Sequence, residues 1–366
     1  MKVAIVCDWL TNMGGGEQVL IELKKIYPEA PIYTSVYDPT HLAPELKNID
    51  VRTSFLQKNK KIIKNHQKYL HLMPTAFESF DFTNYDLVIS CNSSCAHGII
   101  TSPNTKHICY CYTPMRYGWE FFYQYTNDFN FFKRRIAQYM MNYIRIWDKV
   151  SADRVDYFIS ISEYIKNRVY KHYRRDSEVI YPPVRVEMFR PSTKKDYFLV
   201  LSRLVKYKRI DIAIEAFNAL NLPLLIIGTG PEEKKLRKMA KNNVHFLGSL
   251  KDDEILDYYA GAKAFIFPGE EDFGITILEA QASGTPVIAF NKGGATETIN
   301  DKTGILFNEQ NAISLINAIE LFNSMTFNIN DLILNAKKYN SENFRSSIKK
   351  YIDKVLIEEV KHEDSN

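Results

Sequence analysis

The residues best placed to do chemistry are two glutamates, Glu271 and Glu279, on either side of Phe273 and Gly274. An apolar run ending at Phe267 precedes them, and the spacing of apolar residues after Gly274 predicts a helix. The first amides of a helix lack partners and attract an anion such as a diphosphate, which a glycine lets approach closely. Glu271 would lie beside the anion, and Glu279, more than a turn into the helix, could accept two neighbouring ribose hydroxyls.

The two acids also have a simpler interpretation. The start of a helix attracts carboxylates through its dipole, so an acidic loop and a surface glutamate would explain the pattern. A second segment favours the anion site, because Arg203 and Lys208 lie in one loop between a predicted strand and a predicted helix. Two cations suit a diphosphate whose negative charge grows as it leaves, whereas the alternative for this segment is a solvated basic loop.

Two glycine-rich loops are weaker signals. The run Gly228-Thr229-Gly230 follows a predicted strand but lacks the third glycine of a dinucleotide-binding fingerprint. A structural turn with Pro231 at the first helical position would explain it fully. Residues 14–16 are three glycines that follow the first predicted strand, and they form either a second anion-binding loop or a tight turn.

The elements that would position these loops alternate between strands and helices, a pattern typical of parallel sheets with helices on their faces. Ligands of such sheets bind where strands end and helices begin, which is where the candidate residues lie. The predicted strands are 3–7, 32–36, 87–91, 107–112, 157–161, 179–184, 198–201, 224–227, 244–247, 264–267 and 287–290. The predicted helices include 17–26, 209–220, 232–241, 252–260 and 275–282.

The chain is long enough for two domains. Its 366 residues exceed what one core usually holds, and the mixed stretch 185–196 predicts the linker. We therefore expect an α/β fold with two Rossmann-like domains facing each other across a cleft. The domains should comprise residues 1–190 and 191–340, and a C-terminal helix at about 341–366 should pack back on the first domain.

Composition and charge exclude several classes of protein. Hydrophobic residues make up 45% and charged residues 25%, which is ordinary for globular domains. The formal net charge of +4 is too small to indicate a nucleic-acid partner. No run of about 18 apolar residues predicts a transmembrane helix, and the early Asp8 argues against a signal peptide. The sequence therefore predicts a cytoplasmic protein.

Two basic clusters have two interpretations. Lysines alternate with apolar residues between Lys58 and Lys68, and residues 131–135 form a second cluster, Phe-Phe-Lys-Arg-Arg. Each cluster could be a solvated helical face. Each could also be a basic apolar surface that rests on anionic lipid at the inner face of the cytoplasmic membrane.

The five cysteines do not predict disulfides, because their number is odd and no secretion signal is present. A zinc cluster could be built from Cys91, Cys95, Cys109 and Cys111 with His97 and His107. However, Cys109 and Cys111 would share one face of a buried strand, which favours buried thiols. No Asp-x-Asp pair occurs, so we expect no metal on the phosphates and no cofactor.

Taken together, these motifs resemble the retaining glycosyltransferases of family 4, which have the GT-B fold. The resemblance covers essentially the whole chain and is specific as an ordered set. The motifs that carry it are the spacing of Glu271 and Glu279 around Phe273-Gly274, Arg203 with Lys208, the run 228–231, and Gly284-Thr285-Pro286-Val287 followed by Gly293-Gly294.

The resemblance implies roles for particular residues. Arg203 and Lys208 would hold the donor diphosphate, Glu271 would contact the transferred sugar, and Glu279 would bind the ribose, with the base near residues 245–250. The residues implied in catalysis are Glu271, His97, Arg203 and Lys208. The residues implied in donor binding are Gly15, Gly16, Arg203, Lys208, Gly228, Leu250, Glu271, Phe273, Gly274, Ile275 and Glu279. His97 fits a first-domain residue near the reacting centre, although a helix-start residue bonded to the backbone is the alternative.

A narrower resemblance is to bacterial O-antigen mannosyltransferases that use GDP-mannose. It is carried by residues 110–120 and 267–274, although Tyr112 is commonly His and Glu120 commonly Asp in those proteins. It implies transfer of mannose to a hydroxyl of a lipid-linked or oligosaccharide acceptor in polysaccharide synthesis.

The acceptor side is less defined. Arg116 and Trp119 are the candidate acceptor contacts, and the alternative is an aromatic core edge with a surface arginine. Other functions fit the same architecture: a family 4 transferase with a UDP-sugar donor, a sugar-nucleotide epimerase, a nucleotide-sugar binding protein without activity, or an NAD-dependent dehydrogenase. The incomplete glycine fingerprint after Ile227 counts against the dehydrogenase.

Overall fold

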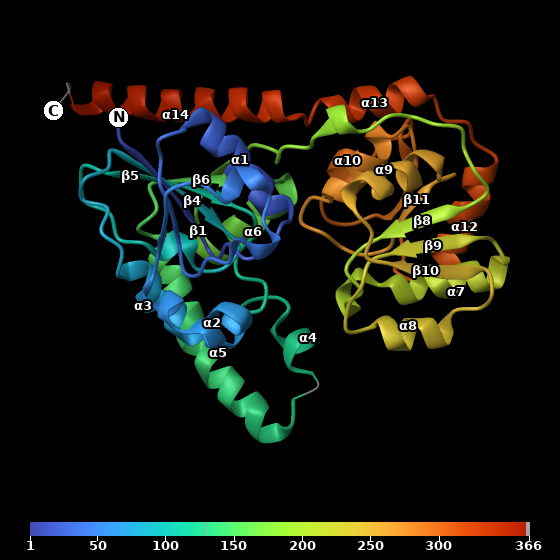
Figure 1. Cartoon of the computed structure of the whole chain (residues 1–366), viewed down its shortest axis with the longest axis horizontal. Coiled ribbons are helices and arrows are strands. Elements are labelled where there is room, and N and C mark those ends of the chain that lie inside the picture. The colour runs from blue at the N-terminus through green and yellow to red at the C-terminus, as the bar shows by residue number, and fades with distance from the viewer. Residues whose placement is uncertain (128, 364–366) are drawn as a thin grey trace. The chain divides into compact units, whose positions relative to one another are not determined.

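The structure is a computed structural model that describes residues 1–127 and 129–363. The chain divides into two compact units (Figure 1). Unit 1 comprises residues 1–181 and the described C-terminal residues from 344 onward, and unit 2 comprises residues 182–343. The sequence analysis placed this boundary between residues 190 and 191.

Unit 1 is a seven-stranded parallel sheet with strand order β3-β2-β1-β4-β5-β6-β7. Every residue of β1 and β4 is buried, as expected for central strands of a sheet covered on both faces. The strands are β1 (Val3–Cys7), β2 (Ile32–Thr34), β3 (Val51–Thr53), β4 (Leu87–Asn92), β5 (Lys106–Cys111), β6 (Tyr157–Ser160) and β7 (Ser177–Val179). The α-helices are α1 (Gly15–Ile26), α2 (Lys60–Asn65), α3 (Met73–Glu78), α4 (Phe122–Thr126), α5 (Phe131–Ala152), α6 (Glu163–Tyr173) and α14 (Ser341–Glu363).

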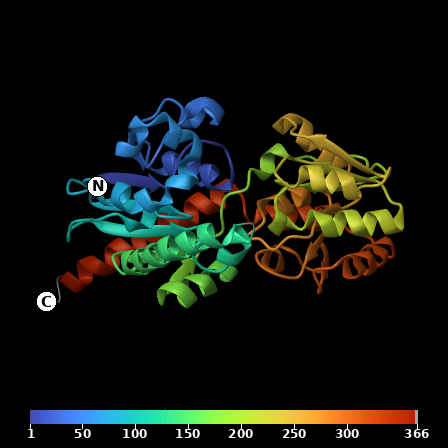
Figure 2. The same ribbon diagram turned by 90° about the horizontal axis from the view of Figure 1, so that it is seen from below.

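The long C-terminal helix α14 completes unit 1 and runs along it in Figures 1 and 2. The ring of Phe344 meets that of Tyr110 on β5 edge to face, with centroids 5.7 Å apart. Arg345 donates to the buried carboxylate of Glu22 on α1. Residues 364–366, which the predicted helix included, lie outside the described residues.

Unit 2 is a six-stranded parallel sheet with strand order β10-β9-β8-β11-β12-β13. Successive side chains alternate between two cores: Phe198 and Val200 join one, and Leu199 joins the other. The strands are β8 (Phe198–Leu201), β9 (Leu224–Ile227), β10 (Val244–Gly248), β11 (Phe265–Phe267), β12 (Val287–Phe290) and β13 (Gly304–Phe307). The helices are α7 (Ile210–Leu220), α8 (Glu233–Met239), α9 (Asp252–Gly261), α10 (Ile275–Ala282), α11 (Ala295–Thr298), α12 (Ala312–Asn323) and α13 (Ile329–Lys337).

Most predicted strands are confirmed to within two residues, because they are buried apolar runs. The predicted strand at 179–184 is displaced: β7 ends at Val179, and the chain then meets Pro182-Pro183, which break the predicted run. Two short strands, β3 and β13, have no counterpart in the sequence prediction.

The same strands and helices determine where the cysteines lie and whether any helix could cross a membrane. All five thiols are buried, as the sequence predicts for strand residues that face a core. Among residues 1–127 and 129–363, no cluster of three or more His, Cys, Asp or Glu is placed to hold a metal ion. Every helix in this described part of the chain is too short or too polar to cross a membrane.

Strand order reverses once in each sheet, between β1 and β4 in unit 1 and between β8 and β11 in unit 2. The chain leaves the two central strands in opposite directions, so the loops at their carboxyl ends diverge and leave room for a ligand. We call these loops the switch loops of each unit.

A buried aspartate ties the switch loops of unit 1 together. The Oδ2 atom of Asp8, just after β1, accepts hydrogen bonds from the backbone amide of Ser93 at 2.6 Å and its hydroxyl at 2.8 Å. The Oδ1 atom accepts the amides of Cys95 and Ala96 at 2.6 and 2.7 Å. Burial raises the pKa of Asp8, and these hydrogen bonds lower it. One side chain therefore fixes the whole turn that follows β4.

We expect the Asp8→Ala variant to lower the free energy of unfolding of unit 1 by about 3 kcal/mol or more, because four donors, two of them buried, lose their acceptor. Urea unfolding followed by tryptophan fluorescence reports this unit, since all three tryptophans lie within residues 1–181. Asp81→Ala is the matched control, because exposed Asp81 accepts both the amide and the hydroxyl of Thr83. Equal losses in the two variants would contradict the assignment.

Candidate functional site

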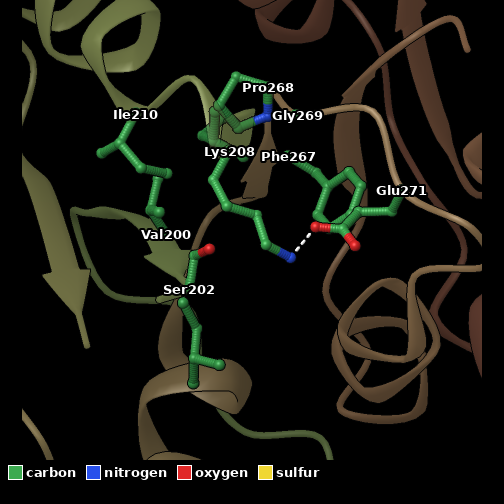
Figure 3. Close-up of a pocket in the computed structure, with 10 residues that line it drawn as sticks. Val200, Ser202, Lys208, Ile210, Phe267, Pro268, Gly269 and Glu271 are labelled. Carbon is green, nitrogen blue, oxygen red and sulfur yellow. Dashed lines mark ion pairs between the residues drawn. The ribbon is translucent and has the colours of Figure 1, made fainter. Parts of the chain in front are cut away.

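The switch loops of unit 2 bring the predicted cation and the predicted acid together. Lys208 lies in the loop after β8 and Glu271 in the loop after β11, the strand beside β8. Their side chains point toward each other across a small pocket, and Lys208 Nζ forms an ion pair with Glu271 Oε1 (Figure 3). Only 18% of the lysine side chain and 14% of the glutamate side chain are exposed.

This ion pair is costly to shield from water, and it persists only because each charge neutralises the other. An anionic ligand at the pocket would compete with Glu271 for Lys208. The other predicted cation, Arg203, lies in the same loop but is exposed, and its Nη2 donates to the hydroxyl of Tyr207 at 3.1 Å. Tyr207 also places its ring 5.4 Å from Lys208 Nζ. The sequence analysis did not single out this tyrosine.

The predicted anion-binding end of α10 has the expected backbone. Gly274 precedes the helix with a φ of 88° and a ψ of 59°, which favours glycine. The N-cap position is this glycine, which has no side chain to cap the helix, and Ile275 is the first residue of α10. Phe273, a predicted donor-binding residue, is buried, and its ring lies 5.7 Å from that of Tyr339.

A pair of glycines supports the loop that carries Glu271. The amide of Gly294 donates to the Glu271 carbonyl at 2.9 Å. A Cβ at Gly293 would lie 2.2 Å from that carbonyl oxygen, and one at Gly294 would lie 2.3 Å from Phe273 Cα. The Gly293-Gly294 motif is therefore required for packing beneath the acidic loop.

Gly228 plays a similar part for the basic loop. Its φ is 128°, and a Cβ there would lie 1.9 Å from the carbonyl oxygen of Ser202. The structure therefore places this predicted donor-binding residue under the loop that holds Arg203. The run 228–230 is a structural loop that packs closely against the basic loop, and Pro231 lies in the turn after it rather than at the first helical position, because α8 starts at Glu233. Leu250 is half-buried and packs against the core on the α10 side of the sheet.

The predicted ribose-binding residue, Glu279, lies in the second turn of α10. Its Oε2 accepts the hydroxyl of Tyr259 on α9 at 2.9 Å. Burial raises the pKa of Glu279, while the Tyr259 hydrogen bond and the positive charge of Arg185 lower it. Tyr259 and Arg185 belong to other segments of the chain, so no sequence motif around Glu279 indicates either residue.

In unit 1, the predicted glycines Gly15 and Gly16 open α1, next to the loop that follows β1. The hydroxyl of Tyr112 donates to the Gly16 carbonyl at 2.8 Å, and a Cβ at Gly16 would lie 3.2 Å from the tyrosine ring. Tyr112, at a position that is commonly His in the O-antigen mannosyltransferases, therefore packs against this glycine loop and holds it by a hydrogen bond.

Glu17, an acid absent from the predicted site residues, lies beside the same glycine loop. Glu17 is half-buried, and a Cβ at Gly14 would lie 3.2 Å from its Oε2. Burial raises the pKa of Glu17 to about 7, the amides of Glu17 and Gly14 lower it, and Asp8 raises it further. Its position directly after three glycines was the available signal.

His97 lies in the core of unit 1, completely buried between the turn after β4 and α5. Its Nε2 lies 2.9 Å from the Ser151 hydroxyl and 3.2 Å from the Asp148 carbonyl oxygen. Burial lowers the pKa of His97 to about 4, so the imidazole is neutral at pH 7. His97 therefore makes the contact expected of the alternative interpretation, a helix-start residue bonded to the backbone.

The candidate acceptor residues lie in a loop that is tied to its surroundings. Trp119 donates from Nε1 to Asp148 Oδ2 at 2.7 Å and stacks on His172, with ring centroids 4.7 Å apart. Burial raises the pKa of Asp148 to about 7. The guanidinium of Arg116 lies 5.7 Å from the ring centroid of Phe121.

Glu17 predicts a pH dependence. Because its pKa is about 7 rather than 4.5, the folded state keeps a proton that the unfolded state releases, and stability falls as pH rises through this window. We expect Glu17→Gln to raise the free energy of unfolding by up to about 3 kcal/mol at about pH 8 and little below about pH 5. Tryptophan-monitored urea unfolding measures it, with Glu163→Gln, an acid in the first turn of α6, as control. A pH-independent difference would refute this account.

Sequence comparison shows what unit 2 is similar to. A family model described as glycosyl transferases group 1 matches residues 187–339. The chain is 31% identical over 202 residues to the GDP-mannose-dependent alpha-(1-6)-phosphatidylinositol monomannoside mannosyltransferase of Mycobacterium tuberculosis, covering 46% of this chain and 52% of that protein. It is 31% identical over 150 residues to the O-antigen chain mannosyltransferase C of Escherichia coli, covering 38% and 40%. The chain spans about half the length of the curated relatives it matches.

Solved structures resemble nearly the whole chain. The lipopolysaccharide outer core galactosyltransferase WaaB has a TM-score of 0.67 at 16% identity, covering 97% of this chain and 99% of that one. Anabaena HepE in complex with UDP has a TM-score of 0.68 at 18% identity, covering 97% and 100%. At these identities the likeness shows the fold, and it confirms the predicted GT-B class with two Rossmann-like domains. Residues 187–339 are therefore similar to the group 1 glycosyl transferases, and the chain as a whole has the GT-B fold.

Proposed function

We propose that the protein is a retaining glycosyltransferase that moves a hexose, in the first instance mannose from GDP-mannose, to a hydroxyl of a lipid-linked glycan. The observation that carries the proposal is the ion pair of Lys208 and Glu271 at the switch loops of a unit that is similar to the group 1 glycosyl transferases. GDP-mannose is favoured because four of the relatives are named as GDP-mannose-dependent mannosyltransferases.

The donor diphosphate would be held by Lys208, Arg203 and the first amides of α10. When the bond between the anomeric carbon and the diphosphate oxygen breaks, negative charge moves onto the diphosphate. Cations and helix amides aimed at that charge stabilise the transition state more than the ground state. In this scheme the protein's own cations hold the phosphates.

Glu271 would change partner during the reaction. In the structure it neutralises Lys208, and a diphosphate that binds the lysine would release the carboxylate. The released carboxylate would accept a hydroxyl of the transferred sugar and stabilise the positive charge that develops at the anomeric carbon. Glu279 would bind the ribose, with its carboxylate oriented by the Tyr259 hydroxyl.

A lipid-linked acceptor would be reached at the membrane surface. The mycobacterial relative is named for a phosphatidylinositol-based acceptor. The lysines between Lys58 and Lys68 are exposed on α2 and the turns beside it, as a contact with anionic lipid would require. The reaction would take place at the inner face of the cytoplasmic membrane.

A thermal-shift panel of nucleotide sugars tests the donor. We expect GDP-mannose to raise the melting temperature most, because a ligand at about 100 times its Kd stabilises the folded state by about 2.7 kcal/mol. UDP-glucose, UDP-galactose and GDP alone complete the panel. A larger shift with a UDP-sugar would replace GDP-mannose as donor, and conversion of donor to an isomer without acceptor would identify an epimerase instead.

The two glutamates should have separable effects. We expect Glu271→Gln to lower kcat about 100-fold or more with donor affinity largely kept, and Glu279→Gln to weaken donor affinity about tenfold. Transfer assays with titrated GDP-mannose separate kcat from KM, and Glu270→Gln is the matched control because Glu270 pairs with exposed Lys292. Full activity of Glu271→Gln would end the proposal that Glu271 acts in the reaction.

A further inference from the structure

The helix α5 is only partly packed on unit 1. It has 22 residues and is about 33 Å long. Its buried residues are Ile144, Asp148, Ser151 and Ala152, all in the C-terminal half. The N-terminal half runs beyond the sheet (Figure 1), where Arg134 donates to the carbonyl of Thr126 at the end of α4.

A straight row of large apolar side chains runs along the outer side of this helix. Its members are spaced four and three residues apart in alternation, so they line one side of the helix. They are Phe132, Ile136, Tyr139, Tyr143, Ile146 and Val150, each between 55% and 82% exposed. We call this row the α5 seam. Phe131 and Tyr123, 68% and 73% exposed, extend the apolar surface at its N-terminal end. A contiguous apolar surface of this kind marks a binding site.

The charge around the seam has one sign. The basic residues of α5 are Lys133, Arg134, Arg135, Arg145 and Lys149, and the only acid is the buried Asp148. Arg134 and Arg145 donate to backbone carbonyls, and Lys149 pairs with Asp153. Lys133 and Arg135 are exposed at the end of the seam where the phenylalanines lie. An apolar row with exposed cations and no exposed acid on its helix suits an anionic apolar partner.

We propose that the α5 seam docks on an anionic lipid bilayer. The helix lies in the plane of the headgroups, with Phe132, Ile136 and Ile146 reaching the acyl chains. Lys133 and Arg135 contact lipid phosphates, and the hydroxyls of Tyr139 and Tyr143 stay in the hydrated headgroup layer. The inference rests on the proposed action on a lipid-linked acceptor, and it adds the α5 seam to the lysines between Lys58 and Lys68 as a membrane contact.

A second copy of the chain fits this face less well. The alternating spacing would suit a helix pair, but α5 itself offers no exposed acid to the basic flanks of a second copy, and the neighbouring Asp153 already pairs with Lys149. A helix pair would also bury the hydroxyls of Tyr139 and Tyr143 in an apolar seam. A bilayer interface avoids both costs.

Co-sedimentation of the full chain with vesicles tests the proposal. We expect binding to vesicles of phosphatidylglycerol and phosphatidylcholine, weakened by salt, and little binding to phosphatidylcholine alone. The triple variant Phe132→Ser, Tyr139→Ser and Tyr143→Ser should reduce binding at least about tenfold. The matched control removes exposed apolar side chains from unit 2 with Ile313→Ser, Leu321→Ser and Leu334→Ser, and it should bind like the parent.

Insertion itself is measured with Tyr139→Trp. We expect a blue shift of the added fluorescence on anionic vesicles and quenching by brominated acyl chains. Absence of vesicle binding by the parent, equal loss in the control variant, or a dimer that the seam substitutions convert to monomer would each overturn the proposal. The GDP-mannose thermal shift, measured on the same variants, should match the parent, so failure of membrane docking is distinguishable from failure of the donor assignment.

Discussion

Both sheets depend on a carboxylate at the place where strand order reverses. The switch loops diverge there, so polar backbone groups at the strand ends need partners. In unit 1, Asp8 supplies them by accepting four hydrogen bonds from the turn after β4. In unit 2, Glu271 bridges the switch loops through one side-chain cation, Lys208. The first bridge is fixed by backbone amides, whereas a ligand can replace the second, and this difference directs the proposed chemistry to unit 2.

The loops around Glu271 depend on close backbone approach. Gly228 lets the turn after β9 lie against Ser202, and Gly293 and Gly294 let the turn after β12 lie against Glu271 and Phe273. Any side chain at these three positions would meet backbone atoms closer than about 2.4 Å, and backbone cannot yield as a flexible side chain does. The primary role of these glycines is therefore structural: they allow the backbone to pack closely beneath the loops that carry the charged residues.

The sequence predicted the two parallel sheets because most strands are continuous buried runs, such as β1 and β4. It missed β3 because Val51–Thr53 is short and not buried, so it carries no apolar pattern. The sequence indicated that Lys208 and Glu271 lie on loops. It could not predict their ion pair, because the two loops are far apart in the sequence and meet only in the folded sheet. The environment of His97 is also tertiary: Ser151 and the Asp148 carbonyl come from α5, more than 50 residues later in the chain. The roles of the candidate residues stay predictions.

The return of α14 to unit 1 affects how the chain can fold as it is made. The described strands of unit 1 have all been synthesised once residue 179 is added. Phe344 and Arg345, which contact Tyr110 and Glu22, are synthesised only after all of unit 2. The carboxylate of Glu22 therefore has no arginine partner during synthesis of about 160 further residues. Unit 2 has been fully synthesised when these residues appear, so unit 1 begins to fold first but gains its last contacts after unit 2 is complete.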